Sequence, residues 1–171
     1  MDWDLKNRTR GELTELAVGL GQKTFCGDYL FSFIHQKHVS NLEQITPLSK
    51  SFRKQLADLG YRISSLALLE KQTDSDGTAK YLFGLPDGGS IESVRLTDKG
   101  RVTLCLSTQA GCRMGCRFCA TGRIPFERNL TAAEIVDQVY QVERDAGPVD
   151  NLVYMGMGEP LEKFSNGFSS V

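Results

Sequence analysis

The spacing of hydrophobic positions along the chain changes twice, near residue 60 and near residue 100. Three segments before residue 60 place their apolar residues on one face of a helix: residues 9–21, 28–39 and 47–60. Thr9 and Glu12 form a capping box at the start of the first segment, and Asp28 is a candidate cap for the second. Residues 1–60 are therefore predicted to form a small accessory domain of about three helices.

The next part of the chain has the pattern of short strands. Turn sequences stand between these strands at Asp76-Gly77, Asp87-Gly88-Gly89 and Lys99-Gly100. Turns of this composition join neighbouring antiparallel strands. Residues 61–100 are therefore predicted to form a β-hairpin segment that connects two larger parts.

The last third of the chain alternates strand, loop, helix and strand. The apolar strand "VTLCLS" is followed by a long loop, and a second capping box, Thr131 with Glu134, begins a helix that ends at Gly147-Pro148. The run "NLVYM" then has the composition of a strand buried on both faces of a parallel sheet. Residues 101–171 are predicted to hold one strand–helix–strand unit. The fold class is α/β, with an α+β N-terminal region.

Charge is concentrated in one segment, although the net charge of the chain is only −1. Residues 95–130 carry seven Lys and Arg against two Asp and Glu. Such a cluster raises the local concentration of a polyanion such as RNA, although a solvated surface balanced by other charges is the alternative. Four arginines are the candidate phosphate contacts: Arg113, Arg117, Arg123 and Arg128.

The chain begins without an apolar signal-peptide core, and no run approaches the length that crosses a membrane. We therefore expect a cytoplasmic protein without a membrane partner. Thiols stay reduced in that compartment, so clustered cysteines there act as ligands or reactive groups rather than as disulfides.

Three cysteines, Cys112, Cys116 and Cys119, are spaced C-x3-C-x2-C on the loop that follows a strand. Three thiolates can hold three irons of a 4Fe-4S cluster and leave the fourth iron open to a small molecule. Zinc is the alternative, with Cys105 as a fourth ligand. Cys105 lies within the strand rather than on a turn, and the aromatic Phe118 suits a cluster that needs shielding from water. The spacing therefore favours the cluster.

The spacing and its aromatic residue resemble the signature of radical S-adenosylmethionine enzymes. Within that group, several segments resemble the RlmN family, which methylates adenine in ribosomal and transfer RNA. The segments are "FIHQKHVSNLEQITPLSKSFRKQL", "SIESVRL", "TLCLSTQAGCRMGCRFCATG", "FERNLTAAEIVDQV" and "NLVYMGMGEPLEKF". The resemblance implies that residues 101–171 begin a radical S-adenosylmethionine barrel of βα units.

The resemblance also implies roles for single residues. The three cysteines of the loop would bind the cluster, and Gly158 and Glu159 would hold the methionine end of S-adenosylmethionine. Glu92 matches the family's proton acceptor, and Cys105 matches the cysteine that resolves a methylated-cysteine intermediate. The implied reaction is methylation of adenine C2 in 23S rRNA and tRNA, with electrons from a flavodoxin-like donor. The sequence leaves open C8 as the methylated position, as in a related resistance enzyme, and either RNA as the single substrate.

One departure from the family pattern concerns the end of the chain at Val171. The family's barrel continues through further strand–helix units to a cysteine that carries the methyl group, and no cysteine follows Cys119 here. We therefore expect a truncated barrel, either a fragment or a chain that a partner completes, and no methyl transfer by these residues alone.

Two other functions fit parts of the pattern. A non-enzymatic RNA-binding module with a structural zinc or iron–sulfur site would also combine a helical domain, a basic loop and clustered cysteines. A radical S-adenosylmethionine enzyme that acts on a small molecule is the third interpretation. The helical domain, together with the pair Glu92 and Cys105, counts against it.

Overall fold

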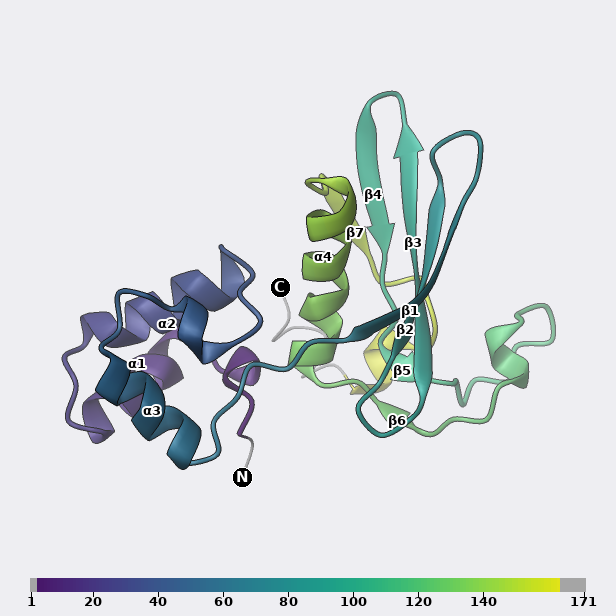
Figure 1. Ribbon diagram of the computed structural model, residues 1–171. Coiled ribbons are helices and arrows are strands. Elements are labelled where there is room, and N and C mark those ends of the chain that lie inside the picture. The colour runs from purple at the N-terminus through teal and green to yellow at the C-terminus, as the bar shows by residue number, and fades with distance from the viewer. Residues whose placement is uncertain (1–2, 164–171) are drawn as a thin grey trace. The chain divides into compact units, whose positions relative to one another are not determined.

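The computed structural model describes residues 3–163, and the chain divides into two compact units, Met1–Ser65 and Leu66–Val171. The first unit is helical, as predicted (Figure 1). Its elements are η1 (Leu5–Asn7), α1 (Arg10–Gly19), α2 (Phe25–His35), η2 (Leu42–Gln44) and α3 (Lys50–Asp58). The three-part division that we predicted from the sequence stays a proposal, because the contacts within the chain define two units.

Local hydrogen bonds explain where the first helices begin. In the predicted capping box of α1, the Thr9 N–H donates to a carboxylate oxygen of Glu12 at 2.7 Å, and the Glu12 N–H donates to the Thr9 hydroxyl at 3.3 Å. Helix α2 begins at Phe25, earlier than expected. Asp28 is not its N-cap; instead its carboxylate accepts a 2.7 Å hydrogen bond from Arg10 of α1.

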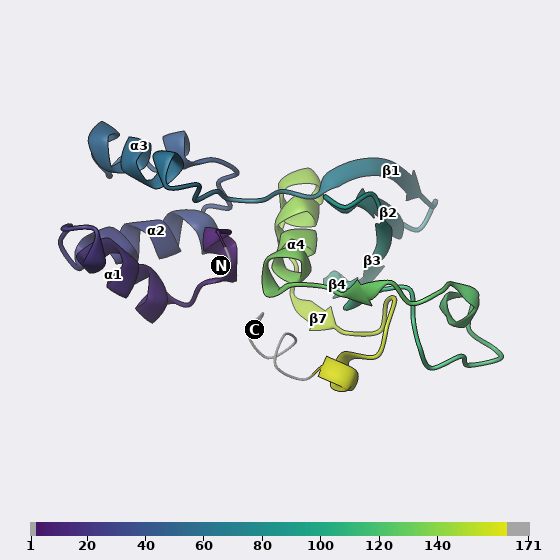
Figure 2. The same ribbon diagram turned by 90° about the horizontal axis from the view of Figure 1, so that it is seen from below.

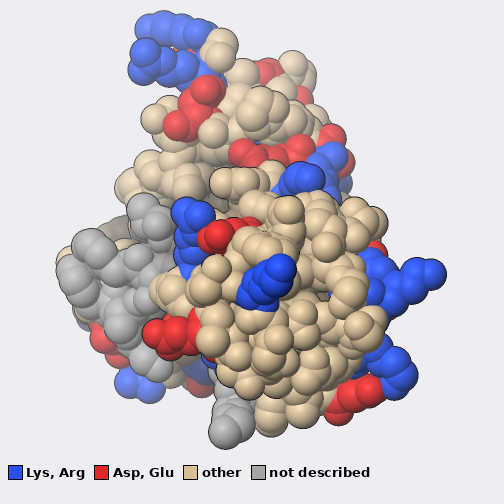
Figure 3. Space-filling model, turned by 90° about the vertical axis from the view of Figure 1, so that its left-hand side faces the viewer, with Lys and Arg blue, Asp and Glu red and all other residues tan. Residues whose placement is uncertain are grey.

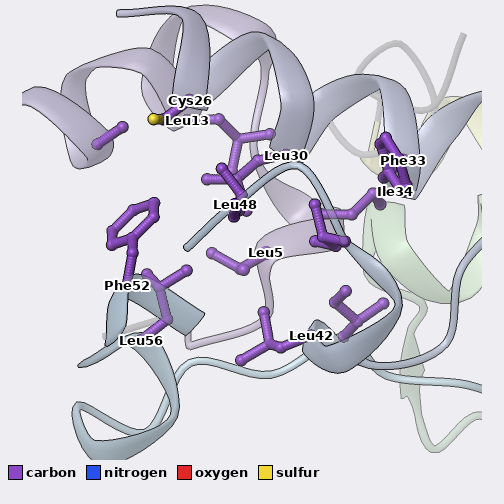
Figure 4. Close-up of a cluster of buried hydrophobic side chains, with 13 residues drawn as sticks. Leu5, Leu13, Cys26, Leu30, Phe33, Ile34, Leu42, Leu48, Phe52 and Leu56 are labelled. Carbon is purple, nitrogen blue, oxygen red and sulfur yellow. The ribbon is translucent and has the colours of Figure 1, made fainter. Parts of the chain in front are cut away.

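The core of the first unit consists mainly of leucine, isoleucine and phenylalanine side chains from the three helices and the segments that join them (Figure 4). Leu13, Leu30 and Leu56 are fully buried in it. Helices α1 and α2 approach closely at Gly27, where a β-carbon would overlap the backbone of Thr14. This contact requires glycine, because any side chain would push the two helices apart.

The second unit is built on a five-stranded sheet with the order β1-β2-β3-β4-β7. Its strands are β1 (Ala67–Thr73), β2 (Ala79–Gly84), β3 (Ser90–Asp98), β4 (Arg101–Cys105) and β7 (Asn151–Val153). The first four strands are antiparallel neighbours joined by the predicted turns, and β7 pairs with β4 in parallel. Helix α4 (Ala132–Ala146) connects β4 to β7 and starts at the predicted capping box. The predicted strand–helix–strand unit is therefore present.

The two faces of this sheet differ in their cover. Helix α4 packs on one face of the sheet (Figure 2). This face carries Tyr81, Phe83, Ile91 and Leu104, which are all buried. The residues that alternate with them point to the opposite face, which we call the open face, and are only partly buried. Polar groups can therefore stand on the open face within reach of a ligand.

Strand β7 differs from the sequence-based expectation. We expected "NLVYM" to be buried on both faces of a sheet, but Leu152 is 42% exposed. The reason is position, because β7 is the last strand in the order and pairs only with β4 in the part of the chain that the structure describes. Within residues 3–163 no helix is both long enough and apolar enough to cross a membrane.

Candidate functional site

The candidate site lies where the loops after β4 and β7 meet. The carboxyl ends of parallel strands point to the same edge of a sheet, so these two loops are neighbours. The N–H of Gly156 donates to the carbonyl of Leu106 at 3.0 Å, and the N–H of Thr108 donates to the carbonyl of Met157 at 2.8 Å. The segment "GMGEP" (residues 156–160) is thus fixed directly against the residues that lead into the loop with the three cysteines.

The glycines of this segment permit the close contact. A β-carbon at Gly158, whose φ is +101°, would lie 2.5 Å from the β-carbon of Gln109. A β-carbon at Gly156 would lie 2.7 Å from the carbonyl oxygen of Leu106. Both distances are shorter than real β-carbon contacts, so the two loops could not approach this closely with larger residues.

Gln109 is a site residue that the sequence analysis missed. Its side chain is fully buried, its amide nitrogen donates to Asn129 at 2.8 Å and Glu162 at 2.6 Å, and its amide oxygen accepts from the N–H of Glu159 at 3.0 Å. Sequence offered one signal, a polar "STQ" run at the end of an apolar strand. Gln109 therefore fixes the position of Glu159, whose own carboxylate accepts from the N–H of Leu161 at 3.0 Å.

Glu92 and Cys105, predicted to act together, lie on the same face of the sheet. Val94 pairs with Cys105 across β3 and β4, and Glu92 shares the face of Val94 because it lies two residues earlier. The carboxylate of Glu92 forms a 3.2 Å ion pair with Lys80 of β2. Burial raises the pKa of the Cys105 thiol, although a hydrogen bond from the N–H of Met155 acts in the opposite direction.

A cavity of about 530 Å³ connects these parts. Its lining includes Glu92 and Lys80 from the open face, Gly111 and Glu127 from the two ends of the loop with the three cysteines, and Met157 from the "GMGEP" segment. This volume lies within the range of small-molecule and cofactor pockets. The cavity therefore joins most of the segments that the sequence singled out.

The loop between Gly111 and Glu127, which we call the cysteine loop, has a fixed base and an exposed tip. Strands β5 (Gln109–Ala110) and β6 (Arg128–Asn129) pair at its base, a small sheet that the sequence analysis missed. Cys112, Cys116 and Cys119 are each partly buried, while the residues between them are exposed.

One thiol of this loop is already polarised by its neighbours. A hydrogen bond from the backbone of Gly122 lowers the pKa of Cys119, and hydrogen bonds from Thr121 add to the effect. Thiolates are the form that binds metal, so this environment favours the ligating state.

The three cysteines do not form a finished metal site. Among residues 3–163, no three His, Cys, Asp or Glu side chains are gathered closely enough to hold a metal ion. Phe118, expected beside a cluster, is 94% exposed in this conformation and shields nothing. The chemistry of three thiols on one loop nevertheless fits an iron–sulfur cluster, and a tip without buried contacts can rearrange around one.

The arginines of the basic segment fall into two groups. Arg128 forms two 2.8 Å hydrogen bonds to the carboxylate of Glu134 and an ion pair with Asp87, and these bonds raise its pKa. Arg113 stacks on the ring of Phe126, with its guanidinium carbon 3.9 Å from the ring centroid. Arg128 is thus committed to contacts within the protein.

The exposed arginines lie on the tip of the cysteine loop. Arg117 and Arg123 are exposed there, and Arg113 keeps much of its side chain in solvent despite a 3.4 Å ion pair with Glu162. On the face of the molecule in Figure 3, by contrast, basic and acidic side chains are scattered between uncharged areas. The tip is therefore the better candidate for a phosphate contact.

Comparison with known proteins finds relatives of this chain. Residues 3–61 match the model of the ribosomal RNA large subunit methyltransferase N-terminal domain. The dual-specificity RNA methyltransferase RlmN of Syntrophobacter fumaroxidans is 48% identical over 160 residues, which are 92% of this chain and 46% of that protein. A probable RlmN of Thermotoga neapolitana is 44% identical, over 94% of this chain and 47% of that protein. The chain spans about half the length of these relatives.

A solved structure is similar to this chain in fold. The crystal structure of a radical SAM methyltransferase from Sphaerobacter thermophilus is 34% identical and has a TM-score of 0.88, and the match covers 99% of this chain and 51% of that one. The predicted α/β class and the predicted likeness to the first part of a truncated radical S-adenosylmethionine enzyme are thereby confirmed. The chain is therefore similar to the N-terminal portion of longer proteins named RlmN.

Proposed function

We propose that this chain is the N-terminal part of a cytoplasmic, dual-specificity RNA methyltransferase that methylates adenine C2 in 23S rRNA and tRNA. Its relatives are named dual-specificity RNA methyltransferase RlmN, and the related crystal structure is of a radical SAM methyltransferase. The observation that carries the proposal is the meeting of the cysteine loop, Glu92 and the "GMGEP" segment at one cavity. A flavodoxin-like protein would deliver the electrons.

The cysteine loop is the proposed cluster site. Cys112, Cys116 and Cys119 would hold a 4Fe-4S cluster, which, when bound, supplies one-electron reduction to S-adenosylmethionine. The paired base at β5 and β6 holds both ends of the loop at the cavity, which Gly111 and Glu127 line. Closure of the exposed tip around the cluster would exclude water, with Phe118 leaving solvent.

The "GMGEP" segment is the proposed site for the methionine part of S-adenosylmethionine. The missing side chain of Gly158 lets Gln109 pack against the segment, and the Glu159 carboxylate would accept hydrogen bonds from the substrate ammonium. Gln109 would hold Glu159 in place through the hydrogen bond to its N–H.

Glu92 and Cys105 are proposed to act on the RNA adenine from the open face of the sheet. Glu92 would accept the proton that leaves the adenine ring, and its ion pair with Lys80 would hold the carboxylate at the cavity, which both residues line. Cys105 would release the product from the cysteine that carries the methyl group in the longer family members. Its sulfur would form a disulfide with that cysteine as the carbon–sulfur bond to the product breaks, and the electron pair of that bond, with a proton, would go to the product.

The test has two stages. First, the chain is reconstituted anaerobically with iron and sulfide and reduced, and its electron paramagnetic resonance spectrum is recorded with and without S-adenosylmethionine. A shift on addition is expected, whereas a colourless protein with one zinc would overturn the proposal. Second, in the protein that carries this chain, Glu92→Gln should lower the yield of 2-methyladenosine by at least about 100-fold. An unchanged yield would remove Glu92 from its role.

RNA binding gives a further expected result. Replacing Arg113, Arg117 and Arg123 by glutamine together should flatten the slope of log affinity against log salt concentration by about 2 to 3, because each lost phosphate contact removes a little under one unit. The measurement is a salt titration of binding to a 23S rRNA hairpin fragment, followed by fluorescence anisotropy.

Arg128→Gln is the matched control for this experiment, because it removes a positive charge from the same segment. Arg128 is engaged with Glu134 and Asp87, so the salt slope should stay the same, while the free energy of unfolding falls by about 1–2 kcal/mol. A slope that changes with Arg128→Gln but not with the triple substitution would move the RNA contact away from the loop tip.

A further inference from the structure

A fully buried polar pair, Ser107 and Gln138, lies behind the proposed site. Both side chains have no exposed surface. Gln138 is on α4, on the face that packs against the sheet, and Ser107 is two residues beyond the end of β4. Buried amides and hydroxyls are costly unless they are hydrogen-bonded, so the partners of this pair show what it does.

Gln138 takes both backbone groups of Ser107. Its amide oxygen accepts from the Ser107 N–H at 2.9 Å, and its amide nitrogen donates to the Ser107 carbonyl at 2.9 Å. A neighbouring strand would use the same two groups in a ladder. The side chain of Gln138 therefore replaces a strand at this residue, and β4 ends at Cys105.

The hydroxyl of Ser107 then joins two parts of the proposed site. It donates to the carbonyl of Glu92 at 2.5 Å and accepts from the N–H of Met157 at 2.9 Å. In the register that pairs Val94 with Cys105, the residue opposite Glu92 is Ser107. The hydroxyl thus continues the contact between β3 and β4 after the backbone has turned away.

We propose that Ser107, held by Gln138, is a positioning residue that sets the distance between Glu92 and the "GMGEP" segment. Removing the hydroxyl leaves the N–H of Met157 without that acceptor in a buried place, and the loop after β7 loses one of its ties to β3. This inference rests on the proposed use of Gly158 and Glu159 in binding S-adenosylmethionine.

Ser93 supplies a matched control within the same network. Its hydroxyl donates to the amide oxygen of Gln138 at 2.7 Å and is nearly as buried as Ser107. Ser93→Ala therefore removes one buried hydrogen bond from the network but breaks neither bond that the Ser107 hydroxyl makes. If the network has a purely structural role, the two variants can differ in stability. Ser107→Ala and Ser93→Ala should then have the same exchange of the Met157 amide and the same affinity for S-adenosylmethionine.

The first measurement is amide hydrogen exchange of the 171-residue chain. In Ser107→Ala, the Met157 amide should exchange at least about tenfold faster than in Ser93→Ala, while amides in β1 and β2 stay protected. Equal exchange of Met157 in the two variants would overturn the proposal. If Ser107→Ala does not fold, Gln138→Met, which keeps the volume, takes its place, and faster exchange at both Ser107 and Met157 is then expected.

The second measurement is the affinity for S-adenosylmethionine of the reconstituted chain, followed by its effect on the cluster's paramagnetic resonance spectrum. Ser107→Ala should weaken this affinity about tenfold at unchanged iron content, and Ser93→Ala should weaken it little. Wild-type protein that does not respond to S-adenosylmethionine would contradict the proposed function instead. A wild-type response that Ser107→Ala retains in full would contradict only the positioning role.

Discussion

Replacing Cys112, Cys116 or Cys119 by alanine is expected to abolish the iron–sulfur cluster of the anaerobically reconstituted chain. Each is one of three thiols on a single loop, and no spare thiol lies on that loop to take the place of a lost ligand. Two remaining protein ligands would leave two irons of the cluster open. The measurement is the iron and sulfide content per chain, together with the brown colour that the cluster gives.

Cys105→Ala and Cys26→Ala are the controls for this prediction. Cys105 lies in β4, where pairing with Val94 and Val153 on both sides restrains its backbone, and Cys26 is buried in the helical unit. Iron content should be unchanged in both variants. If Cys105→Ala loses the metal as completely as the loop variants, a site with four cysteines and zinc becomes the better description.

The parts of the fold that the sequence predicted depend on interactions between near neighbours. The capping box of Thr131 and Glu134 starts α4 where predicted, because both groups lie within one turn. The turn at Lys99-Gly100 joins β3 to β4, and both residues have positive φ, as a tight hairpin requires. Such features need only a few adjacent residues, so the sequence alone contains enough information to identify them.

The parts that the sequence missed depend on residues far apart in the chain. Gln109 contacts Glu159 and Glu162, about fifty residues away, and Gln138 contacts Ser107 across 31 positions. The sequence does contain one signal for Gln138, because this polar residue interrupts the apolar stripe that Ile135 and Val142 form on α4. A polar residue within such a stripe indicates a buried partner, but only the fold identifies which one.

The cysteines lie between these two cases. Their spacing indicated a shared loop and the chemistry of the ligands, and the structure places them on one loop beside the cavity. The gathering of the three sulfurs is not encoded in the contacts of the protein, since the tip has no buried core. The free energy needed to bring the three sulfurs together would come from metal binding, as it does in other sites that form around their metal.

The base of the same loop gives the second large effect. Gly111 has a φ of +74°, and a β-carbon there would overlap the carbonyl oxygen of Pro125, where the chain returns. Gly111→Ala should force the two sides of the base apart and break the 2.8 Å hydrogen bond from the N–H of Glu127 to the carbonyl of Ala110. We expect a loss of about 3 kcal/mol in the free energy of unfolding and a cluster content near zero.

Gly115→Ala separates backbone strain from the contact at the base. Gly115 is in the same loop and also has a positive φ, +60°, but a β-carbon there meets nothing within 4 Å. The Gly115→Ala substitution should lower the free energy of unfolding by about 1 kcal/mol, from the left-handed conformation alone, and leave iron binding largely intact. Denaturant unfolding and iron content are measured for both variants. If Gly111→Ala binds iron as well as Gly115→Ala does, the closed base is not required for the cluster, and the cysteines must be gathered by the tip of the loop alone.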